Sequence, residues 1–194
     1  MIIFINGPPG SGKDEAADII RRRVHGSVTV RLSSPLKRGL QELLGLDFQE
    51  WNEMLRQGNK DKPITFHSNV TTRQALIKLS EEYLKPIFGK DIFGQIAVRK
   101  MRGLAASHYI LDIGFNEELV PILDKYSRGN CRLLRLSRPG CSFDNDSRYY
   151  VDVDMLGLGP FWCKIHNEHD KDIFEAQIVK VLRQWKLLPK AELE

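Results

Sequence analysis

Residues 1–14 read Met1-Ile-Ile-Phe-Ile-Asn-Gly-Pro-Pro-Gly-Ser-Gly-Lys-Asp14 and combine three signals in one order. The apolar run from Ile2 to Ile5 predicts a buried strand. The loop after it matches the phosphate-binding pattern G-x-x-x-x-G-K, and a helical pattern begins directly afterwards. Backbone N–H groups in such a loop and at the helix N-terminus attract phosphate. The expected binding residues are Gly7, Pro9, Gly10, Ser11, Gly12 and Lys13; the alternative is a glycine-rich turn before an ordinary helix.

Asp14 departs from this pattern, because the residue after the lysine is usually a serine or threonine whose hydroxyl binds magnesium. A carboxylate also suits magnesium, directly or through water. We therefore predict that Asp14 is a magnesium ligand. The alternative is that Asp14 is only a favourable negative charge in the first turn of a helix.

The composition is that of an ordinary soluble protein of one domain, with 194 residues, 42% of them hydrophobic and 28% charged. No apolar stretch approaches the length needed to cross a bilayer, so we expect no membrane partner. We also expect no signal peptide, because the first strand runs straight into the loop. Three cysteines without C-x-x-C spacing predict a reducing, cytoplasmic location.

The formal net charge is +4, and its tightest cluster is Arg21-Arg22-Arg23. Cations are favoured at the C-terminus of a helix, so we interpret this cluster as a solvated helix end rather than a DNA-binding patch. A modest basic excess also suits a pocket that holds several phosphates. The expected partners are small-molecule nucleotides and no stable nucleic acid, with a homodimer left open.

Strand-like and helix-like patterns alternate along the chain, which predicts a five-stranded parallel sheet with helices on both faces. Strands are predicted over residues 2–5, 28–32, 109–113 and 132–136, and more weakly over 162–165. Helices are predicted over residues 14–24, 35–44, 48–57, 72–83, 92–106, 117–126 and 172–185. We expect one domain, residues 1–194, with a core of 1–32 and 102–194, a helical insertion over about 33–101 and a lid over about 137–150.

Five charged residues outside the loop are candidates for the same site, because ligands bind beyond the carboxyl ends of parallel strands. Asp112 ends the third strand, where it could orient magnesium or the acceptor, or simply cap a helix. Lys37 and Arg73 lie in first turns of helices, where a bound anion would relieve the misplaced positive charge. Arg138 and Arg148 bracket the lid and would match phosphate oxygens, or would be solvated loop residues.

In these features the chain resembles the deoxynucleoside monophosphate kinases of tailed phages, within the larger group of P-loop nucleoside monophosphate kinases. The resemblance covers most of the chain, but only the phosphate loop is a highly specific motif by itself. The segments that carry the resemblance are Ser11-Gly-Lys-Asp14, Leu32-Ser-Ser-Pro-Leu-Lys37, Thr72-Arg-Gln-Ala-Leu-Ile77 continuing to Phe93, Tyr109-Ile-Leu-Asp112 with Asn116-Glu117, and Leu134-Arg-Leu-Ser-Arg-Pro-Gly140.

The resemblance implies a P-loop kinase fold and transfer of the terminal phosphate of ATP, with Mg²⁺, to a deoxynucleoside monophosphate, which feeds dNTP synthesis. It implies that the loop and Lys13 hold the donor and that Arg138 and Arg148 close over the transferred group. The implied acceptor residues are Lys37, Arg73, Gln74 and Asp112, and Asn167, in Ile165-His-Asn167, would lie near the donor base.

Gly114 departs from the family, whose sequences often have an arginine two residues after the aspartate of the third strand. Another basic residue would have to substitute for it. Three rival functions remain: a kinase of the same fold with another acceptor, such as dephospho-coenzyme A; a binding module that hydrolyses ATP slowly; and a DNA-binding accessory protein, which would show steep salt dependence.

Overall fold

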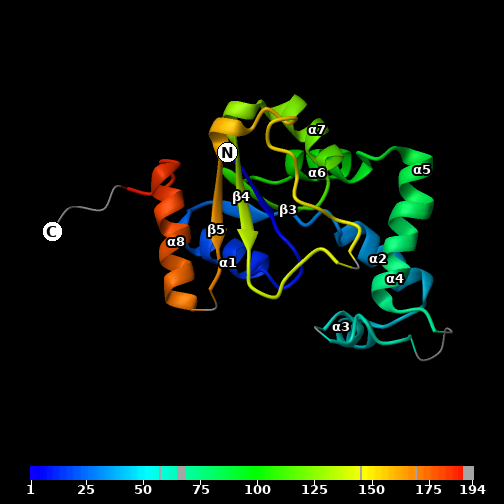
Figure 1. Ribbon diagram of the computed structural model, residues 1–194. Helices are drawn as coiled ribbons and strands as arrows, with labels where there is room; N and C mark the ends of the chain where they lie inside the picture. Colours follow the sequence, from blue (N-terminus) through cyan, green and yellow to red (C-terminus); the bar gives the residue numbers. More distant parts are fainter. Residues whose placement is uncertain (57, 65–68, 145, 169, 190–194) are drawn as a thin grey trace. The chain divides into compact units, whose positions relative to one another are not determined.

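The computed structural model describes residues 1–56, 58–64, 69–144, 146–168 and 170–189 (Figure 1). The chain forms two compact units, Met1–Leu32 with Phe93–Glu194, and Ser33–Ile92. The predicted insertion extends to residue 101, whereas the second unit ends at Ile92. The helix α6 (Ile92–Arg102) therefore belongs almost entirely to the first unit. Its Gly94 approaches the next helix so closely that a Cβ atom there would overlap the carbonyl oxygen of Glu118.

The first unit contains a parallel five-stranded sheet in the order β2-β3-β1-β4-β5, which confirms the predicted sheet. The strands are β1 (Ile2–Asn6), β2 (Ser27–Thr29), β3 (His108–Ile113), β4 (Cys131–Ser137) and β5 (Trp162–His166). Only β2 differs clearly from its predicted bounds, 28–32. Val30 still donates a backbone hydrogen bond to Ile110, but the chain then leaves the sheet.

Helices cover both faces of this sheet (Figure 1). On one face, α1 (Lys13–Arg23) and α8 (Lys171–Gln184) share a buried core with the strands, which includes Ile3, Ile5 and Ile110. Successive side chains of a strand point to opposite faces. Phe4 and Leu111 therefore face the other side, where α6 and α7 (Asn116–Tyr126) lie. Two short 3-10 helices, Arg128–Asn130 and Gly159–Phe161, precede β4 and β5.

The second unit is helical, as predicted, and is built around the buried residues Leu40, Leu46 and Trp51. Its elements are α2 (Ser34–Leu43), α3 (Phe48–Leu55), α4 (Thr72–Lys78), the π-helix η1 (Leu79–Leu84) and α5 (Lys85–Phe88). The helix predicted to end at residue 83 thus continues to residue 88. Pro86 cannot follow an ordinary α-helical turn without losing a hydrogen bond and clashing, and the wider π turn directly before it offers a way to accommodate the ring.

None of the helices in the described residues combines the length and the apolar character needed to span a membrane.

Candidate active site

The phosphate loop connects β1 to α1, and its glycines are required by its shape. Gly10 and Gly12 have φ angles of 79° and 98°, in the left-handed region that favours glycine. The first hydrogen bond of α1 runs from the Ala16 N–H to the Gly12 carbonyl, at 2.9 Å. The amides of Lys13 and Asp14 precede that bond, so the helix does not use them, and they are suited to an anion.

The phosphate loop packs tightly against the end of β4 and against Asn167. A Cβ atom at Gly7 would lie 2.7 Å from both the Leu136 carbonyl oxygen and the buried Ser11 Oγ. Asn167, which the resemblance places near the donor base, is buried, and its Nδ2 donates to the Ser11 carbonyl at 3.1 Å. The same Nδ2 would lie 2.7 Å from a Cβ atom at Gly12. The Asn167 side chain therefore supports the loop from within, while Pro9 is half-buried at its turn.

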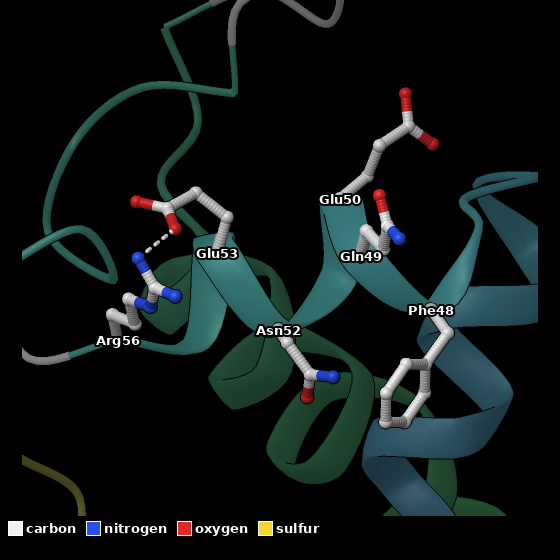
Figure 2. Close-up of a pocket in the computed structure, with 6 residues that line it drawn as sticks. All are labelled: Phe48, Gln49, Glu50, Asn52, Glu53 and Arg56. Atoms are coloured by element: carbon white, nitrogen blue, oxygen red, sulfur yellow. Dashed lines mark ion pairs between the residues drawn. The ribbon is translucent and has the colours of Figure 1, made fainter.

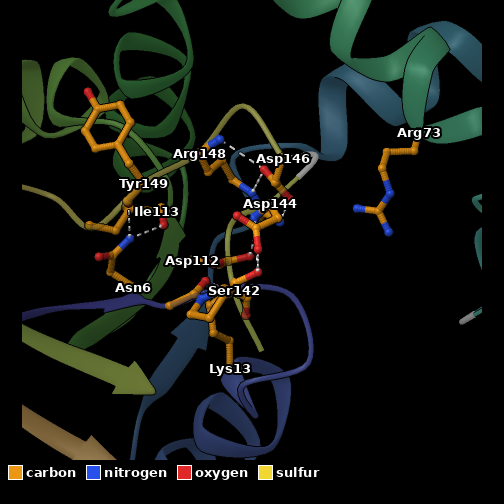
Figure 3. Close-up of polar contacts among 12 residues, drawn as sticks. Asn6, Lys13, Arg73, Asp112, Ile113, Ser142, Asp144, Asp146, Arg148 and Tyr149 are labelled. Atoms are coloured by element: carbon orange, nitrogen blue, oxygen red, sulfur yellow. Dashed lines mark hydrogen bonds and ion pairs between the residues drawn. The ribbon is translucent and has the colours of Figure 1, made fainter. Parts of the chain in front are cut away.

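Lys13 folds back over this loop. Its Nζ donates to the carbonyl oxygens of Gly7 and Pro8, at 2.8 and 2.9 Å. Burial lowers the pKa of Lys13, and the negative charge of Asp112 opposes that shift. Arg148 lowers the pKa further, so the charges of Lys13, Asp112 and Arg148 act on one another at this edge of the sheet (Figure 3).

Arg148 is held by two carboxylates. Its Nε and one terminal nitrogen donate to the two oxygens of Asp146, at 2.8 and 2.7 Å, and its other terminal nitrogen lies 3.9 Å from Asp112 Oδ2 (Figure 3). Burial lowers the pKa of Arg148, but the hydrogen bonds with Asp146 and the charge of Asp112 outweigh it and raise the pKa. Arg148 therefore carries its full charge at neutral pH.

Gly114 provides the space for this arginine. A Cβ atom at Gly114 would overlap the Cγ and Cδ atoms of Arg148. The side chain of Arg148 thus lies where a side chain at position 114 would begin. The resemblance expects an arginine at position 114, and the structure brings a different arginine to that place.

The start of the predicted lid, residues 137–150, also touches the loop. A terminal nitrogen of Arg138 donates to the Gly10 carbonyl at 3.1 Å. The Sγ atom of Cys141 would lie 3.1 Å from a Cβ atom at Gly10. Five of the predicted site residues, Gly10, Lys13, Asp112, Arg138 and Arg148, therefore lie in one region of the first unit.

Asp14, the predicted magnesium ligand, has a different environment. Its side chain is 84% exposed, and one carboxylate oxygen lies 3.2 Å from a terminal nitrogen of Arg31. No group of three His, Cys, Asp or Glu side chains among the described residues could hold a metal ion. A magnesium ion bound at Asp14 would therefore draw its other ligands from water and from phosphate oxygens.

Lys37, Arg73 and Gln74 belong to the second unit. The Arg73 side chain is paired with Asp61, with Nε 2.6 Å from Oδ1 and a terminal nitrogen 3.1 Å from Oδ2. Gln74 forms a capping box with Thr71, which begins α4. Lys37 is half-buried in the first turn of α2. The misplaced charge that the sequence shows at Arg73 is thus met by a carboxylate of its own unit.

Sequence reasoning missed two residues of the first unit. Asp146 holds Arg148, and Asn6 connects three segments through its buried amide. Asp146 gave no local signal, because it lies in a segment without periodicity. Asn6 did give one: it is the single polar residue between the apolar run of β1 and Gly7.

A hollow of about 530 Å³ lies on α3, and none of the residues that line it is a predicted site residue. It is lined by Phe48, Gln49, Glu50, Asn52, Glu53 and Arg56. Figure 2 shows Glu50 pointing to one side of the helix and Phe48 and Asn52 to the other. The hollow therefore follows the outside of a single helix and does not enclose a ligand.

Comparisons with protein-family models and with curated proteins find no match for this chain. Among solved structures it is similar to thymidylate kinase from Candida albicans, with a TM-score of 0.49 and 13% identity over 96% of this chain and 92% of that one. It is also similar to dephospho-CoA kinase from Campylobacter jejuni (TM-score 0.43, 13% identity, 94% and 96% covered). A third is shikimate kinase from Aquifex aeolicus (TM-score 0.40, 12% identity, 96% and 99% covered). These similarities are too distant to carry an argument about activity.

Proposed function

We propose that this chain is a phosphotransferase that moves the terminal phosphate of ATP to a deoxynucleoside 5′-monophosphate. The observation that carries the proposal is the set of charges beside the phosphate loop: Lys13 on the loop, and Arg148 fixed 3.9 Å from Asp112. The sequence resemblance supplies the class of acceptor. Dephospho-coenzyme A is the rival acceptor within the same fold.

The residues of the first unit suit the demands of phosphoryl transfer. This reaction needs alignment and charge neutralisation more than covalent chemistry from the protein. The loop amides and Lys13 would bind the donor phosphates, and Arg138 and Arg148 would neutralise the transferred group. Asp112 would orient the acceptor. A phosphate acceptor is already ionised, so no general base is required.

Magnesium fits the acidic side chains at this edge. Carboxylates are the protein ligands that it prefers, and Asp14 offers an 84% exposed carboxylate at the start of α1. Asp14 and Asp112 are the residues that would hold the ion, directly or through water. When bound, magnesium supplies neutralising charge for the phosphate oxygens.

Arg73, Lys37 and Gln74 of the second unit would recognise the acceptor. The guanidinium that binds Asp61 through two nitrogens has the geometry that also binds a phosphate. We infer that the acceptor phosphate takes the place of the Asp61 carboxylate on Arg73. Lys37 would add a second positive charge.

The test is a coupled assay of ADP release, with ATP and magnesium, against deoxynucleoside and ribonucleoside monophosphates, dephospho-coenzyme A and no acceptor. We expect fast turnover with one or a few deoxynucleoside monophosphates. Lys13→Met should abolish it, while Lys180→Met, on the exposed side of α8, should not. Slow turnover that is indifferent to every acceptor would instead support a nucleotide-hydrolysing binding module.

A further inference from the structure

Asn6 is a buried polar residue at the end of the central strand β1, directly before the phosphate loop. Its side chain is 0% exposed, yet it forms three hydrogen bonds to the backbone. Its Nδ2 donates to the carbonyl oxygens of Ile113 and Tyr149, both at 3.1 Å (Figure 3). Its Oδ1 accepts from the Val151 N–H at 3.1 Å. One amide thus connects β1, the end of β3 and the segment that follows Arg148.

The chain that Asn6 holds begins one residue after Arg148. Tyr149 is tied to the same place by three further bonds. Its N–H donates to the Gly114 carbonyl at 3.1 Å, its hydroxyl donates to Glu117 at 3.0 Å, and the same hydroxyl accepts from the Asn116 N–H at 3.2 Å. The contact with Glu117 is exposed, whereas two of the three bonds of Asn6 are buried. Buried hydrogen bonds face little competition from water, so the bonds of Asn6 hold this segment more firmly than those of the Tyr149 hydroxyl.

This anchoring fixes where Arg148 projects. The backbone beyond it is held at Tyr149 and Val151, and its side chain lies over Gly114. The guanidinium is thereby placed beside Asp112. Because catalytic groups lose much of their effect when displaced by about 1 Å, a residue that sets this position controls the reaction without touching the substrate.

We propose that Asn6 is a positioning residue that holds Arg148 in place by anchoring the segment that follows it, Tyr149–Val151. The kinetic part of this inference rests on the phosphotransferase activity proposed above. An apolar side chain would complete the pattern of β1, but it would leave the Tyr149 carbonyl and the Val151 N–H without the partner they have in Asn6. Two of the three hydrogen bonds of the amide thus go to the segment after Arg148, and the third goes to Ile113 at the end of β3.

The first test follows the anchoring itself and needs no activity. Trypsin cleaves after arginine, so the rate of cleavage between Arg148 and Tyr149 reports release of this segment. Asn6→Ala and Asn6→Asp should raise that rate by about tenfold or more, since cleavage follows the population of the open form. Asn6→Asp keeps the size of the side chain and the acceptor for Val151, and serves if Asn6→Ala does not fold.

Ile178→Val, in the core between α8 and the sheet, is the control for a general loss of stability. Arg148→Ala identifies the band, because it removes that cleavage site. An unchanged rate after Arg148, or a rise that only matches Ile178→Val and the sites at Arg21–Arg23, would overturn the proposal. If both Asn6 variants fail to fold while Ile178→Val folds, Asn6 serves the core and the proposal is equally wrong.

The second test is a double-mutant cycle in the ADP-release assay. Asn6→Ala should lower kcat by about 30- to 100-fold with little change in the KM for ATP, because a displaced arginine affects mainly the chemical step. In an Arg148→Ala background the same change should cost almost nothing more. Independent, multiplying losses would contradict a role through Arg148. If the unaltered protein phosphorylates no acceptor, the proposed function fails, while the trypsin result still decides the role of Asn6.

Discussion

Two arginines predicted to bind phosphate, Arg148 in the first unit and Arg73 in the second, each grip an aspartate through Nε and a terminal nitrogen. The carboxylates differ in their exposure to water. The side chain of Asp146, on Arg148, is 6% exposed, whereas that of Asp61, on Arg73, is 58% exposed. The chain therefore contains two arginine–aspartate pairs of the same geometry, one with a buried carboxylate and one with an exposed carboxylate.

A buried carboxylate cannot leave its partner without a large penalty, while an exposed one exchanges freely with water and salt. Arg148 is thus a fixed group, held by Asp146 and seated over Gly114. Arg73 is a group whose partner can be replaced. A guanidinium suited to two carboxylate oxygens is also suited to phosphate, so we expect Arg148 to act in the chemical step and Arg73 in acceptor binding.

The largest effect should come from Arg148→Ala, which removes the fixed guanidinium. We expect kcat to fall about 10³-fold, the lower end of what a catalytic arginine contributes to phosphoryl transfer. Arg148→Lys should recover little of it, because an ammonium lacks the planar fork. Steady-state kinetics on protein shown by circular dichroism to be folded would measure this. A kcat within threefold of the original would contradict the fixed role.

Gly114→Ala should have the next largest effect, about a 10²-fold loss in kcat, because it displaces Arg148 without removing it. The new Cβ atom would overlap the Cγ and Cδ atoms of Arg148, which lie in the middle of the side chain and cannot simply swing away. Gly39→Ala is the matched control, since a Cβ atom there meets nothing within 4 Å. Equal kinetics for the two variants would show that Arg148 does not depend on the space at Gly114.

Asp146 and Asp61 should contribute differently to the free energy of unfolding of the protein. Asp146→Asn removes the charge from a buried carboxylate and should lower the free energy of unfolding by about 2 kcal/mol. Asp61→Asn, at an exposed pair, should change it by at most about 0.5 kcal/mol. Urea unfolding of both variants would provide the comparison. Equal losses would mean that burial does not distinguish these pairs.

Arg73→Ala should raise the KM for the acceptor by about tenfold and leave kcat within a few-fold, because it removes binding that the ground state and transition state share. This is the converse of the expectation for Arg148. A fall in kcat at unchanged KM would place Arg73 in the chemical step. Arg56→Ala, at the end of α3, is the control for loss of a surface arginine of the same unit.

Much of the first unit was predictable because its signals are local. The apolar run of β1, the glycines of the loop and the alternation of strands with helices lie within short windows, and the sheet and phosphate loop follow from them. The prediction for residues 72–83 was wrong at its end, because Pro86 normally stops a helix and here follows a π turn. The second unit ends at Ile92 and not near residue 101, where the end of the insertion was predicted, since α6 packs against α7 in the first unit.

The contacts that distinguish the two arginines were not predictable. They depend on backbone groups and on residues far apart in the sequence: Asn6 with Tyr149, and Gly114 with Arg148. In the sequence, Gly114 stands where related sequences often have an arginine. In the structure, the absence of a side chain at Gly114 leaves room for Arg148, which was predicted to lie on a lid. A backbone carbonyl can accept a hydrogen bond from a buried amide whatever the residue type that carries it, so the sequence does not indicate such a contact.

The smallest expected effect concerns the pH dependence of the exposed pair. The hydrogen bond from Arg73 lowers the pKa of Asp61 below its ordinary value of 3.8. A carboxyl whose pKa is depressed on folding stabilises the protein above the unfolded pKa, and that contribution is lost as the pH falls through the folded value. The unfolding midpoints of the unaltered protein and Asp61→Asn should therefore differ slightly at pH 5 and converge below pH 3.8.

The difference at pH 5 should stay within about 0.5 kcal/mol, because water screens an exposed pair. High salt should abolish it, as it should weaken the grip of Asp61 on Arg73 and leave that arginine to phosphate. A difference that persists in high salt would mean that Asp61 is held as firmly as Asp146, and Arg73 could not then exchange its carboxylate for an acceptor.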